Sequence, residues 1–322
     1  MPPKISLAIA TYNGEAFLRE QLESICNQTL LPFEVVISDD GSTDDTLKII
    51  KEFEGRLNIR VIQHDSNKGV NKNFEVAIFS CKGDYVMPCD QDDIWMYGKI
   101  ERSYEQMKEI ELTHGKDVPV LISSECSLFH DDKPIIQKEG LFQGVMDDSL
   151  SFLFANNLHC QGCSMMMNKS LLAILPSFPE RFNDFPYDVF ISMITTMMGV
   201  RSHLIQSLMY YRIHENNVAA RYEKERFSEV VKKRVRMITY SVFGIPYSRQ
   251  VHFSELLIEY GIEIKEETIK EYTMAISKFW NSSVIERISI IYSIKDMPLS
   301  VRIKQAATTF LTSPLRLIVK PL

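Results

Sequence analysis

Short apolar runs alternate with segments of helical periodicity along the amino-terminal part of the chain. Each apolar run is long enough for a strand that is buried on both faces. These runs lie at residues 5–10, 34–38 and 58–63. The segments with apolar residues at helical spacing lie at residues 17–25, 43–53 and 71–80. This alternation predicts an α/β domain with a mostly parallel sheet and right-handed crossovers.

A fourth apolar run, at residues 85–88, is followed by three carboxylates within four residues, Asp90, Asp92 and Asp93. A turn signal precedes this run, so we expect a strand with the carboxylates at its carboxyl end. In an extended segment Asp90 and Asp92 share one side and reach one hard cation, Mg²⁺ or Mn²⁺, while Asp93 faces elsewhere. A bound cation would offset the repulsion between adjacent anions. The alternative is that Asp92 or Asp93 only caps the helix that Lys99 begins.

The first two predicted strands also lead into polar groups. The first is followed by Thr11-Tyr12-Asn13-Gly14, and the second by Asp39-Asp40-Gly41-Ser42. Open α/β sheets bind ligands at the carboxyl ends of their strands, where the strand order reverses. We therefore expect all three polar clusters at one edge of one sheet. The alternative for the second cluster is an ordinary turn, because Asp, Gly and Ser all favour turns.

In this order and spacing, the polar clusters resemble motifs of the inverting family 2 glycosyltransferases. The matching segments are Ser6–Gly14, Gln28-Thr29, Phe33-Glu34, Asp39–Asp44, Asn67–Gly69, Asn73-Phe74 and Cys89–Trp95. The resemblance covers roughly residues 4–217. It implies a GT-A fold, a Rossmann-like α/β domain that binds a nucleotide sugar on a mostly parallel central sheet. The Cys89–Trp95 segment is most similar to rhamnosyltransferase-type members that build bacterial surface polysaccharides.

The resemblance also implies which residues bind the nucleotide sugar. They are Thr11, Tyr12, Asn13, Asp39, Asp40, Asn73, Asp90 and Gln91. Tyr12 with Thr11 would hold the base, and Asp40, with Asp39 nearby, would accept the N3 hydrogen of a pyrimidine. Asn73 either contacts the donor or simply opens a helix.

The metal ligands implied by the resemblance are Asp90 and Asp92. His214 lies in a Tyr-Arg-x-His segment, where it would complete the metal site or contact a phosphate; the alternative is a structural histidine. The implied cofactor is Mg²⁺ or Mn²⁺, and the sequence does not choose between them.

The resemblance implies that Asp188, which precedes an apolar helical stretch at residues 191–198, is the general base for an inverting transfer. Family members commonly carry His or Glu immediately before this Asp, whereas this chain has Tyr187. That departure keeps Asp184 as a second candidate. The structural alternative for Asp188 is a helix cap.

The chain is expected to contain a catalytic domain at residues 1–220 and a helical region at residues 221–322. The segment 299–322 combines basic and apolar residues without an acid, so it could lie on an anionic membrane surface. It could instead cover the catalytic domain or a second subunit, as in a homo-oligomer.

The composition is that of a globular protein with a large hydrophobic core. The 322 residues are 45% hydrophobic and carry a net charge of −6, which allows a large core and gives no general attraction to nucleic acid. Six scattered cysteines are typical of reduced thiols in a cytoplasm, and the chain begins without a signal peptide. We expect a cytoplasmic protein, with peripheral contact to the inner face of the plasma membrane through the tail.

The expected reaction is metal-dependent transfer of rhamnose or another hexose from a dTDP- or UDP-linked donor. The acceptor would be a hydroxyl group of a growing or lipid-linked glycan in bacterial surface polysaccharide synthesis. One alternative is a catalytically idle subunit that binds nucleotide sugars. Another is a phosphohydrolase that delivers water to the same donors.

Overall fold

The computed structural model describes residues 2–130, 133–134, 161–175, 177–178 and 186–214. They belong to a compact unit formed by Met1–Gly144 and His159–His214. A second unit comprises Val145–Leu158 and Glu215–Leu322. Asp184, the predicted helical region 221–322 and its basic tail lie outside the described residues.

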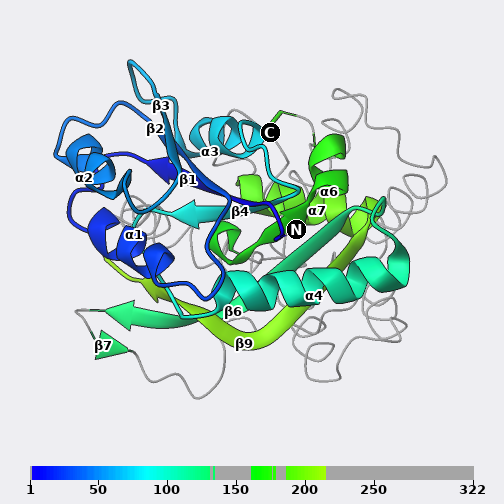
Figure 1. The fold of residues 1–322 in the computed structure, drawn as a ribbon. Coiled ribbons are helices and arrows are strands. Elements are labelled where there is room, and N and C mark those ends of the chain that lie inside the picture. The colour runs from blue at the N-terminus through cyan, green and yellow to red at the C-terminus, as the bar shows by residue number, and fades with distance from the viewer. Residues whose placement is uncertain (1, 131–132, 135–160, 176, 179–185, 215–322) are drawn as a thin grey trace, which may run out of the picture. The chain divides into compact units, whose positions relative to one another are not determined.

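The described strands form one mixed sheet (Figure 1), in the order β3-β2-β1-β4-β8-β6-β9-β5, with β7 paired to β6. Its first part contains the four predicted parallel strands, β1 (Ile5–Thr11), β2 (Glu34–Asp39), β3 (Ile59–Gln63) and β4 (Tyr85–Asp90). β4 is longer than expected, so Asp90 is its last residue. β3 is only partly buried, whereas β1 and β2 lie inside the sheet and carry the apolar runs of buried strands.

The second part of the sheet contains the later strands, and the last of them, β9, ends near the loop that follows β4. These strands are β5 (Ile94–Trp95), β6 (Val120–His130), β7 (Lys133–Pro134), β8 (Met166–Asn168) and β9 (Val200–Arg212). β8 joins β4 to β6 in antiparallel pairing, and β9 runs parallel to β6. The short β5 pairs with β9, with Ile94 opposite Tyr210. This pairing places the carboxyl end of β9 beside the loop that follows Asp90.

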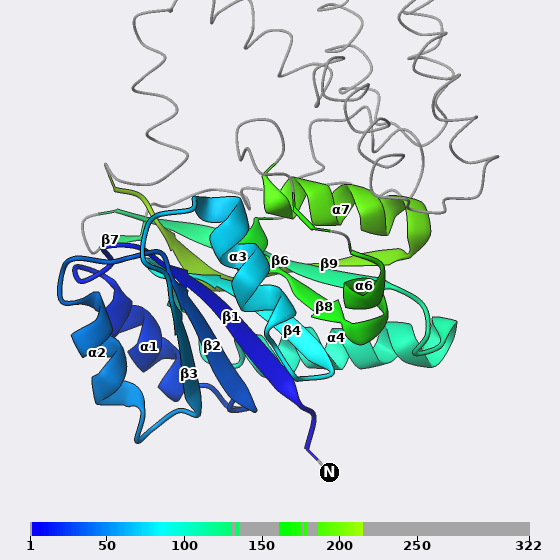
Figure 2. The ribbon, with the colours of Figure 1, turned by 90° about the horizontal axis from the view of Figure 1, so that it is seen from above.

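Helices cover both faces of the sheet. α1 (Leu18–Cys26), α2 (Thr46–Phe53) and α4 (Lys99–His114) lie on one face in Figure 2, and α3 (Val70–Phe79), α6 (Lys169–Ile174) and α7 (Tyr187–Met198) lie on the other. α1, α2 and α3 correspond to the three predicted helices. The residue that caps α4 is Gly98, in the left-handed conformation with φ 89°. Neither Asp92 nor Asp93 caps that helix, so the capping alternative is wrong.

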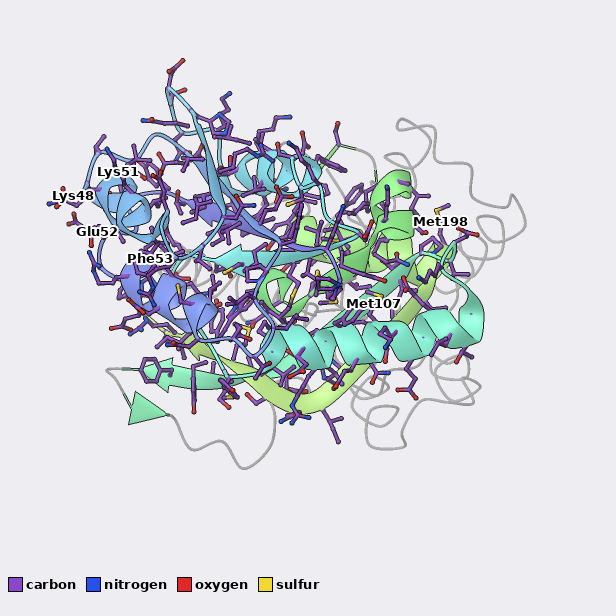
Figure 3. The ribbon with its side chains drawn as sticks, viewed as in Figure 1. Lys48, Lys51, Glu52, Phe53, Met107 and Met198 are labelled. Atoms are coloured by element: carbon purple, nitrogen blue, oxygen red, sulfur yellow. The ribbon has the colours of Figure 1, made fainter. Side chains whose placement is uncertain are left out.

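The core lies between these helices and the sheet. Leu7, Ile9, Val35 and Ile37 are completely buried in the central strands. The helices turn their apolar sides to them and their charged sides outward. In Figure 3, Lys48, Lys51 and Glu52 lie on the outer side of α2, while Phe53 of the same helix is buried. This amphipathic pattern is the one that predicted the helix.

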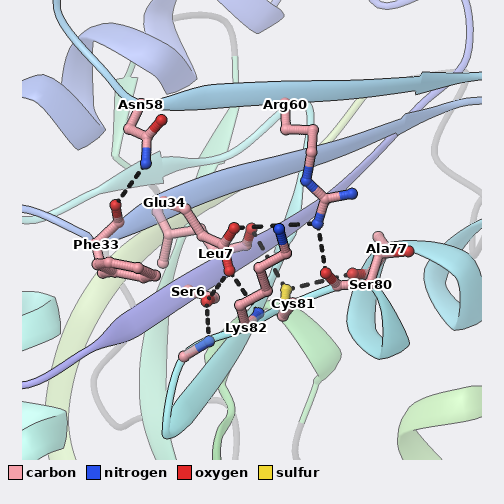
Figure 4. A network of polar contacts seen from close by, with 11 residues as sticks. Ser6, Leu7, Phe33, Glu34, Asn58, Arg60, Ala77, Ser80, Cys81 and Lys82 are labelled. Atoms are coloured by element: carbon pink, nitrogen blue, oxygen red, sulfur yellow. Dashed lines mark hydrogen bonds and ion pairs between the residues drawn. The ribbon is translucent and has the colours of Figure 1, made fainter.

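A buried carboxylate ties the amino ends of the central strands together (Figure 4). Glu34, at the start of β2, is 5% exposed. Its Oε1 accepts hydrogen bonds from Ser6 Oγ, at 2.7 Å, and from the backbone N–H of Lys82. Ser6 Oγ also accepts from the backbone N–H of Gly83, at 2.9 Å. The network lies at the opposite end of the strands from the three polar clusters, so it is a structural feature of the sheet.

We predict that Glu34→Ala lowers the free energy of unfolding by about 1–3 kcal/mol, because it leaves the buried hydroxyl of Ser6 and the backbone N–H of Lys82 without their acceptor. Urea denaturation would measure this change. Glu54→Ala is the control, since Glu54 is exposed, and surface substitutions of this kind stay within about 0.5 kcal/mol. Equal midpoints for the two variants would contradict the structural role of Glu34.

Candidate active site

The carboxyl ends of β1, β2 and β4 meet at one edge of the sheet, as the sequence predicts. The strand register places Thr11 opposite Asp39 and Ala10 opposite Asp90. β1 has β2 on one side and β4 on the other, so the strand order reverses there. In open α/β sheets this is where ligands bind.

Asp39 is fully buried and holds the turn that follows β2. Its Oδ2 accepts from Thr11 Oγ1 at 2.8 Å and from Ser42 Oγ at 2.6 Å. Its Oδ1 accepts from the backbone N–H of Ser42 at 2.9 Å. Asp39 therefore stabilises the turn after β2 and also holds the end of β1 through Thr11. Its role toward a nucleotide stays a prediction.

Asp40 anchors the loop between β3 and α3. Its two oxygens accept from the backbone N–H groups of Lys68 and Gly69, at 2.8 and 2.9 Å. Gly69 has φ 90°, a conformation that favours glycine. A carboxylate offers about four acceptor positions, so Asp40 keeps capacity for one more donor such as a pyrimidine N–H.

Tyr12 and Asn13 form the loop after β1. The side-chain amide of Gln91 bonds to both backbone groups of Tyr12, at 2.9 Å to N and 3.1 Å to O. A Cβ on Gly14 would lie 2.3 Å from Gln91 Oε1, so this close packing needs glycine. Asn13, at φ 47°, accepts from the backbone N–H of Thr43. The ring of Tyr12 stays 41% exposed, which leaves it available to a ligand.

Asn73 lies inside α3 and does not open it, because the residue before the helix is Gly69. Its Nδ2 donates to the carbonyl oxygen of Thr11 at 3.1 Å. Its Oδ1 is buried and has no hydrogen-bond partner among the described residues. The helix-opening alternative is wrong, and Asn73 supports the end of β1.

The loop after β4 departs from the extended geometry expected of it. Gln91 and Asp92 form a turn, which separates the directions of the carboxylates. Asp92 Oδ2 lies 2.8 Å from Nε2 of His214, and the ring of His214 packs 4.4 Å from that of Phe17. His214 therefore lies beside one of the two predicted metal ligands, and its role toward a metal stays a prediction.

Asp93 corrects the sequence interpretation. It was expected to face away from Asp90, but it is 1% exposed and turned toward it. Oxygen atoms of Asp90 and Asp93 and the Sγ of Cys163 all lie within 4.8 Å of one another. Cys163 belongs to the short 3₁₀ helix η1 (Gly162–Ser164), which packs against β4. The turn at residues 91–92 is the physical reason, because it rotates Asp93 inward.

The carboxylates strongly affect one another. Burial raises the pKa of Asp90 to about 7, and the negative charges of Asp92 and Asp188 act in the same direction. Burial also raises the pKa of Asp93, with further contributions from Asp92 and Asp90. A positive charge among these groups would reverse both effects.

Arg212, at the end of β9, clamps this loop. Its Nε donates to the carbonyl oxygen of Asp92 at 3.0 Å, and its backbone N–H donates to Asp93 Oδ1 at 3.3 Å. Its guanidinium pairs with Glu20 of α1 and lies between the rings of Phe17 and Phe129. Arg212 therefore pairs with a protein carboxylate and sets the position of the loop.

Asp188 lies in the first turn of α7, where the sequence expects a helix. Its Oδ2 accepts from the backbone N–H of Gly162 at 3.2 Å, and its Oδ1 accepts from that of Val189 at 2.8 Å. The residue before the helix is Pro186, so Asp188 is not the cap. The charges of Asp90 and Asp188 both act on the buried Tyr187, whose pKa rises chiefly through burial. Asp188 thus lies beside the carboxylates of β4.

Tyr187 replaces the polar neighbour found in family members, and it packs tightly. A Cβ on Gly162 would lie 1.8 Å from its hydroxyl oxygen. Its ring stacks on Phe74 of α3 at 4.2 Å, and its backbone N–H donates to Asn71 Oδ1. These contacts fix the start of α7, and with it Asp188, against α3.

By residue type, Asp90, Asp92 and His214 would offer a divalent cation two carboxylates and an imidazole, a donor set suited to Mn²⁺ and, through its oxygens, to Mg²⁺. Among the described residues, the ligand atoms that lie within 4.8 Å of one another are instead those of Asp90, Asp93 and Cys163. Burial and the negative charges of Asp92 and Asp188 raise the pKa of Asp90, so a cation beside Asp90 would favour its ionised form. Asp90 ends β4, Asp92 lies in the turn that follows, and His214 follows β9, the strand that pairs with β5.

Sequence reasoning missed two supporting residues from distant segments, Glu20 and Asn71. It gave no role to Asp93, although Asp93 lies in the acidic segment that the sequence singled out, and it did not place Gly162 and Cys163 beside the carboxylates. Glu20 and Asn71 carry no local signal, since they are defined only by partners more than a hundred residues away.

Comparison with known proteins assigns the class. The family model "Glycosyl transferase family 2" matches residues 6–174, more than half of the chain. The protein therefore belongs to glycosyl transferase family 2 and is a glycosyltransferase, with the GT-A type of fold. The matched segment contains the ends of β1, β2 and β4 described above.

Individual relatives agree with this class. An uncharacterized glycosyltransferase of Haemophilus influenzae is 25% identical over 315 residues, covering 94% of this chain and 95% of its own. TarS of Staphylococcus aureus, a poly(ribitol-phosphate) β-N-acetylglucosaminyltransferase, is 39% identical over 93 residues. That match covers 28% of this chain and 16% of TarS.

Solved structures share the fold. Residues 1–349 of S. aureus TarS with UDP-GlcNAc superimpose with a TM-score of 0.54 at 19% identity, covering 97% of this chain and 92% of that one. The mannosyltransferase PcManGT of Pyrobaculum calidifontis, in complex with GDP-Man and Mn²⁺, gives a TM-score of 0.51 at 15% identity. It covers 98% of this chain and 88% of its own.

We predict that Arg212→Lys weakens Mn²⁺ binding by about tenfold or more, because a lysine cannot hold the Asp92 carbonyl, Glu20 and two rings at once. Titration of Mn²⁺ followed by electron paramagnetic resonance would measure the affinity. Arg19→Lys is the matched control, since Arg19 forms an exposed ion pair with Glu52. Unchanged Mn²⁺ affinity in Arg212→Lys would contradict the clamp.

Proposed function

We propose that this glycosyltransferase catalyses metal-dependent, inverting transfer of a hexose from a nucleoside diphosphate sugar to a hydroxyl group of a growing glycan. One observation carries the proposal: Asp188, the candidate base, lies close enough to Asp90 for its charge to raise the pKa of that carboxyl. The base from α7 and the carboxylates after β4 therefore belong to one site. Such an arrangement suits attack on a sugar whose diphosphate is bound at β4.

The donor site proposed here lies at the ends of β1 and β2. Tyr12, exposed and held through its backbone by Gln91, would contact the base together with Thr11. Asp40, supported by Asp39, would accept the pyrimidine N3 hydrogen, and Asn13, Asn73, Asp90 and Gln91 complete the proposed contacts. The two leading donors are dTDP-rhamnose and UDP-linked hexoses. The fold of TarS with UDP-GlcNAc supports the second, while PcManGT binds GDP-Man on a similar fold.

Asp90, Asp92 and His214 would hold the Mg²⁺ or Mn²⁺. When bound, the cation supplies positive charge opposite the diphosphate, whose negative charge grows as it leaves the sugar. Asp92 Oδ2 and His214 Nε2 lie 2.8 Å apart, so a cation held by both would take the place of the proton that they share. Arg212 keeps the backbone of Asp92 in place while this occurs.

Asp188 would act as the general base. Its carboxylate takes the proton of the acceptor hydroxyl as the oxygen attacks the anomeric carbon on the face opposite the diphosphate. The N–H of Gly162 holds one oxygen of Asp188, which fixes the direction of the other. Inversion follows, because bond formation and bond breaking occur on opposite faces of the sugar.

A role in bacterial surface polysaccharide synthesis fits the relatives. TarS acts, by its name, on poly(ribitol-phosphate), and another relative of the catalytic segment is a chondroitin synthase of Escherichia coli. The acceptor would be a glycan, free or lipid-linked. Among the described residues no helix is long and apolar enough to cross a membrane. Contact of the tail at residues 299–322 with an anionic membrane surface, or with a second subunit, remains part of the proposal.

Calorimetric titration with dTDP-rhamnose, UDP-hexoses and their nucleotides, with and without Mn²⁺, tests the donor site. We expect one nucleotide to bind in a metal-dependent manner, and Asp92→Asn to remove that dependence because it weakens the ligand set. Asp84→Asn is the control, since Asp84 is exposed at the other end of β4. Undiminished Mn²⁺-dependent affinity in Asp92→Asn would rule out its metal role. Binding without turnover would favour an idle subunit, and donor consumption without acceptor a phosphohydrolase.

Asp188→Asn should leave nucleotide affinity near normal while turnover falls at least about a hundredfold, because asparagine keeps an acceptor for the N–H of Gly162 but cannot take a proton. Steady-state kinetics together with calorimetry would separate the two effects. Asp65→Asn, an exposed substitution, serves as the control. Retained turnover in Asp188→Asn would transfer the role to Asp184.

A further inference from the structure

A second set of metal-binding atoms lies directly behind the proposed donor cation. It consists of Asp90, Asp93 and Cys163, whose ligand atoms lie within 4.8 Å of one another. Asp93 is 1% exposed, and its Oδ2 is buried without a hydrogen-bond partner among the described residues. The Cys163 thiol faces both carboxylates, and its hydrogen bonding acts to lower the pKa of Asp90 and of Asp93. One weak thiol donor leaves two buried carboxylates short of partners, which a cation at this position would supply.

Three separate elements build this set. Asp90 ends β4, Asp93 precedes β5, and Cys163 lies in η1, which packs on β4. The other oxygen of Asp93 accepts from the backbone N–H of Arg212, so the carboxylate is held with one oxygen toward Cys163. Asp90 is only partly buried, whereas Asp93 and Cys163 are buried.

The donor atoms select a class of cation. Mg²⁺ and Mn²⁺ prefer oxygen ligands, whereas a thiolate with carboxylates suits Zn²⁺ or Cd²⁺. The family 2 resemblance places the donor cation on Asp90 and Asp92, which offer only hard oxygen ligands. The set with Cys163 contains a soft sulfur ligand and uses Asp93 in place of Asp92. The two sets share Asp90.

Charge supports the same assignment. Two carboxylates and one thiolate carry one more negative charge than a divalent cation neutralises. Lys99 is fully buried nearby, with its Nζ 4.9 Å from the ring of Trp95. Burial lowers the pKa of Lys99, while Cys163, Cys89 and Asp93 act to raise it. Burial thus disfavours the ammonium form of Lys99, and the negative charges of Cys163 and Asp93 act against that effect.

We propose that Asp90, Asp93 and Cys163 bind a thiophilic divalent cation of the Zn²⁺ or Cd²⁺ class, and that this binding competes with Mg²⁺ or Mn²⁺ for Asp90. Cation binding replaces the proton of the Cys163 thiol, which passes to solvent. The site is an inhibitory one for sugar transfer, because Asp90 cannot serve both cations. The inhibition rests on the proposed function, whereas the binding does not.

Titration of the full chain with Cd²⁺ tests the site through the ultraviolet charge-transfer band of a cadmium–thiolate bond. We expect one such band in the unmodified protein and its loss in Cys163→Ser. Cys126→Ser should keep the band, since Cys126 is a second buried thiol that bonds to Gln161. Absence of a band in the unmodified protein, or an equal band in Cys163→Ser, would overturn the proposal.

Asp93→Asn provides a variant that retains the thiol. It should weaken Cd²⁺ binding by at least about tenfold, because it replaces a charged ligand. Circular dichroism would establish that both variants are folded. Unchanged Cd²⁺ affinity in folded Asp93→Asn would remove Asp93 from the site.

Competition is measured separately, by release of bound Mn²⁺ in electron paramagnetic resonance. Cd²⁺ should release Mn²⁺ from the unmodified protein and fail to do so in Cys163→Ser at the same concentration. A charge-transfer band without Mn²⁺ release would overturn the sharing of Asp90. Failure of the proposed transferase function would leave the band intact, so the two failures are distinguishable.

Discussion

The repulsion among Asp90, Asp92 and Asp93 is the constraint on which the arrangement of this molecule depends. Asp90 and Asp92 are partly buried and Asp93 is buried, and burial and mutual repulsion raise the pKa of Asp90 and of Asp93. The protein holds them together through Arg212, whose N–H groups bind the loop and whose guanidinium is compensated by Glu20. The same repulsion makes the loop a place where a cation binds favourably.

The long parallel pair β6 and β9 supports that loop. β9 carries Arg212 at its end and His214 just beyond it, and its pairing with β5 fixes both beside the carboxylates. On the other face, α7 is fixed against α3 through Asn71 and Phe74, which places Asp188. A GT-A domain of this kind thus assembles one site from its first and last described elements.

Local patterns predicted the first half of the fold because each strand there is a continuous apolar run with a polar end. They placed Asp39 and Asp90 at one sheet edge, which the register confirms. They did not predict the turn at residues 91–92, since the spacing of Asp90 and Asp92 suits an extended strand equally well. Contacts such as Arg212 with Glu20 depend on the pairing of β5 with β9, for which a two-residue strand leaves no sequence signal.

The buried polar residues around β1 and β2 have a consequence for redesign. Asp39 and Asp40 hold three backbone N–H groups of the surrounding loops, so exchanging either one to change the preferred nucleotide would also loosen the scaffold. Tyr12 differs, because Gln91 secures its main chain and leaves its ring outside the hydrogen-bonded network. Under the proposed function, a library directed at donor preference would therefore vary position 12 and keep the two aspartates.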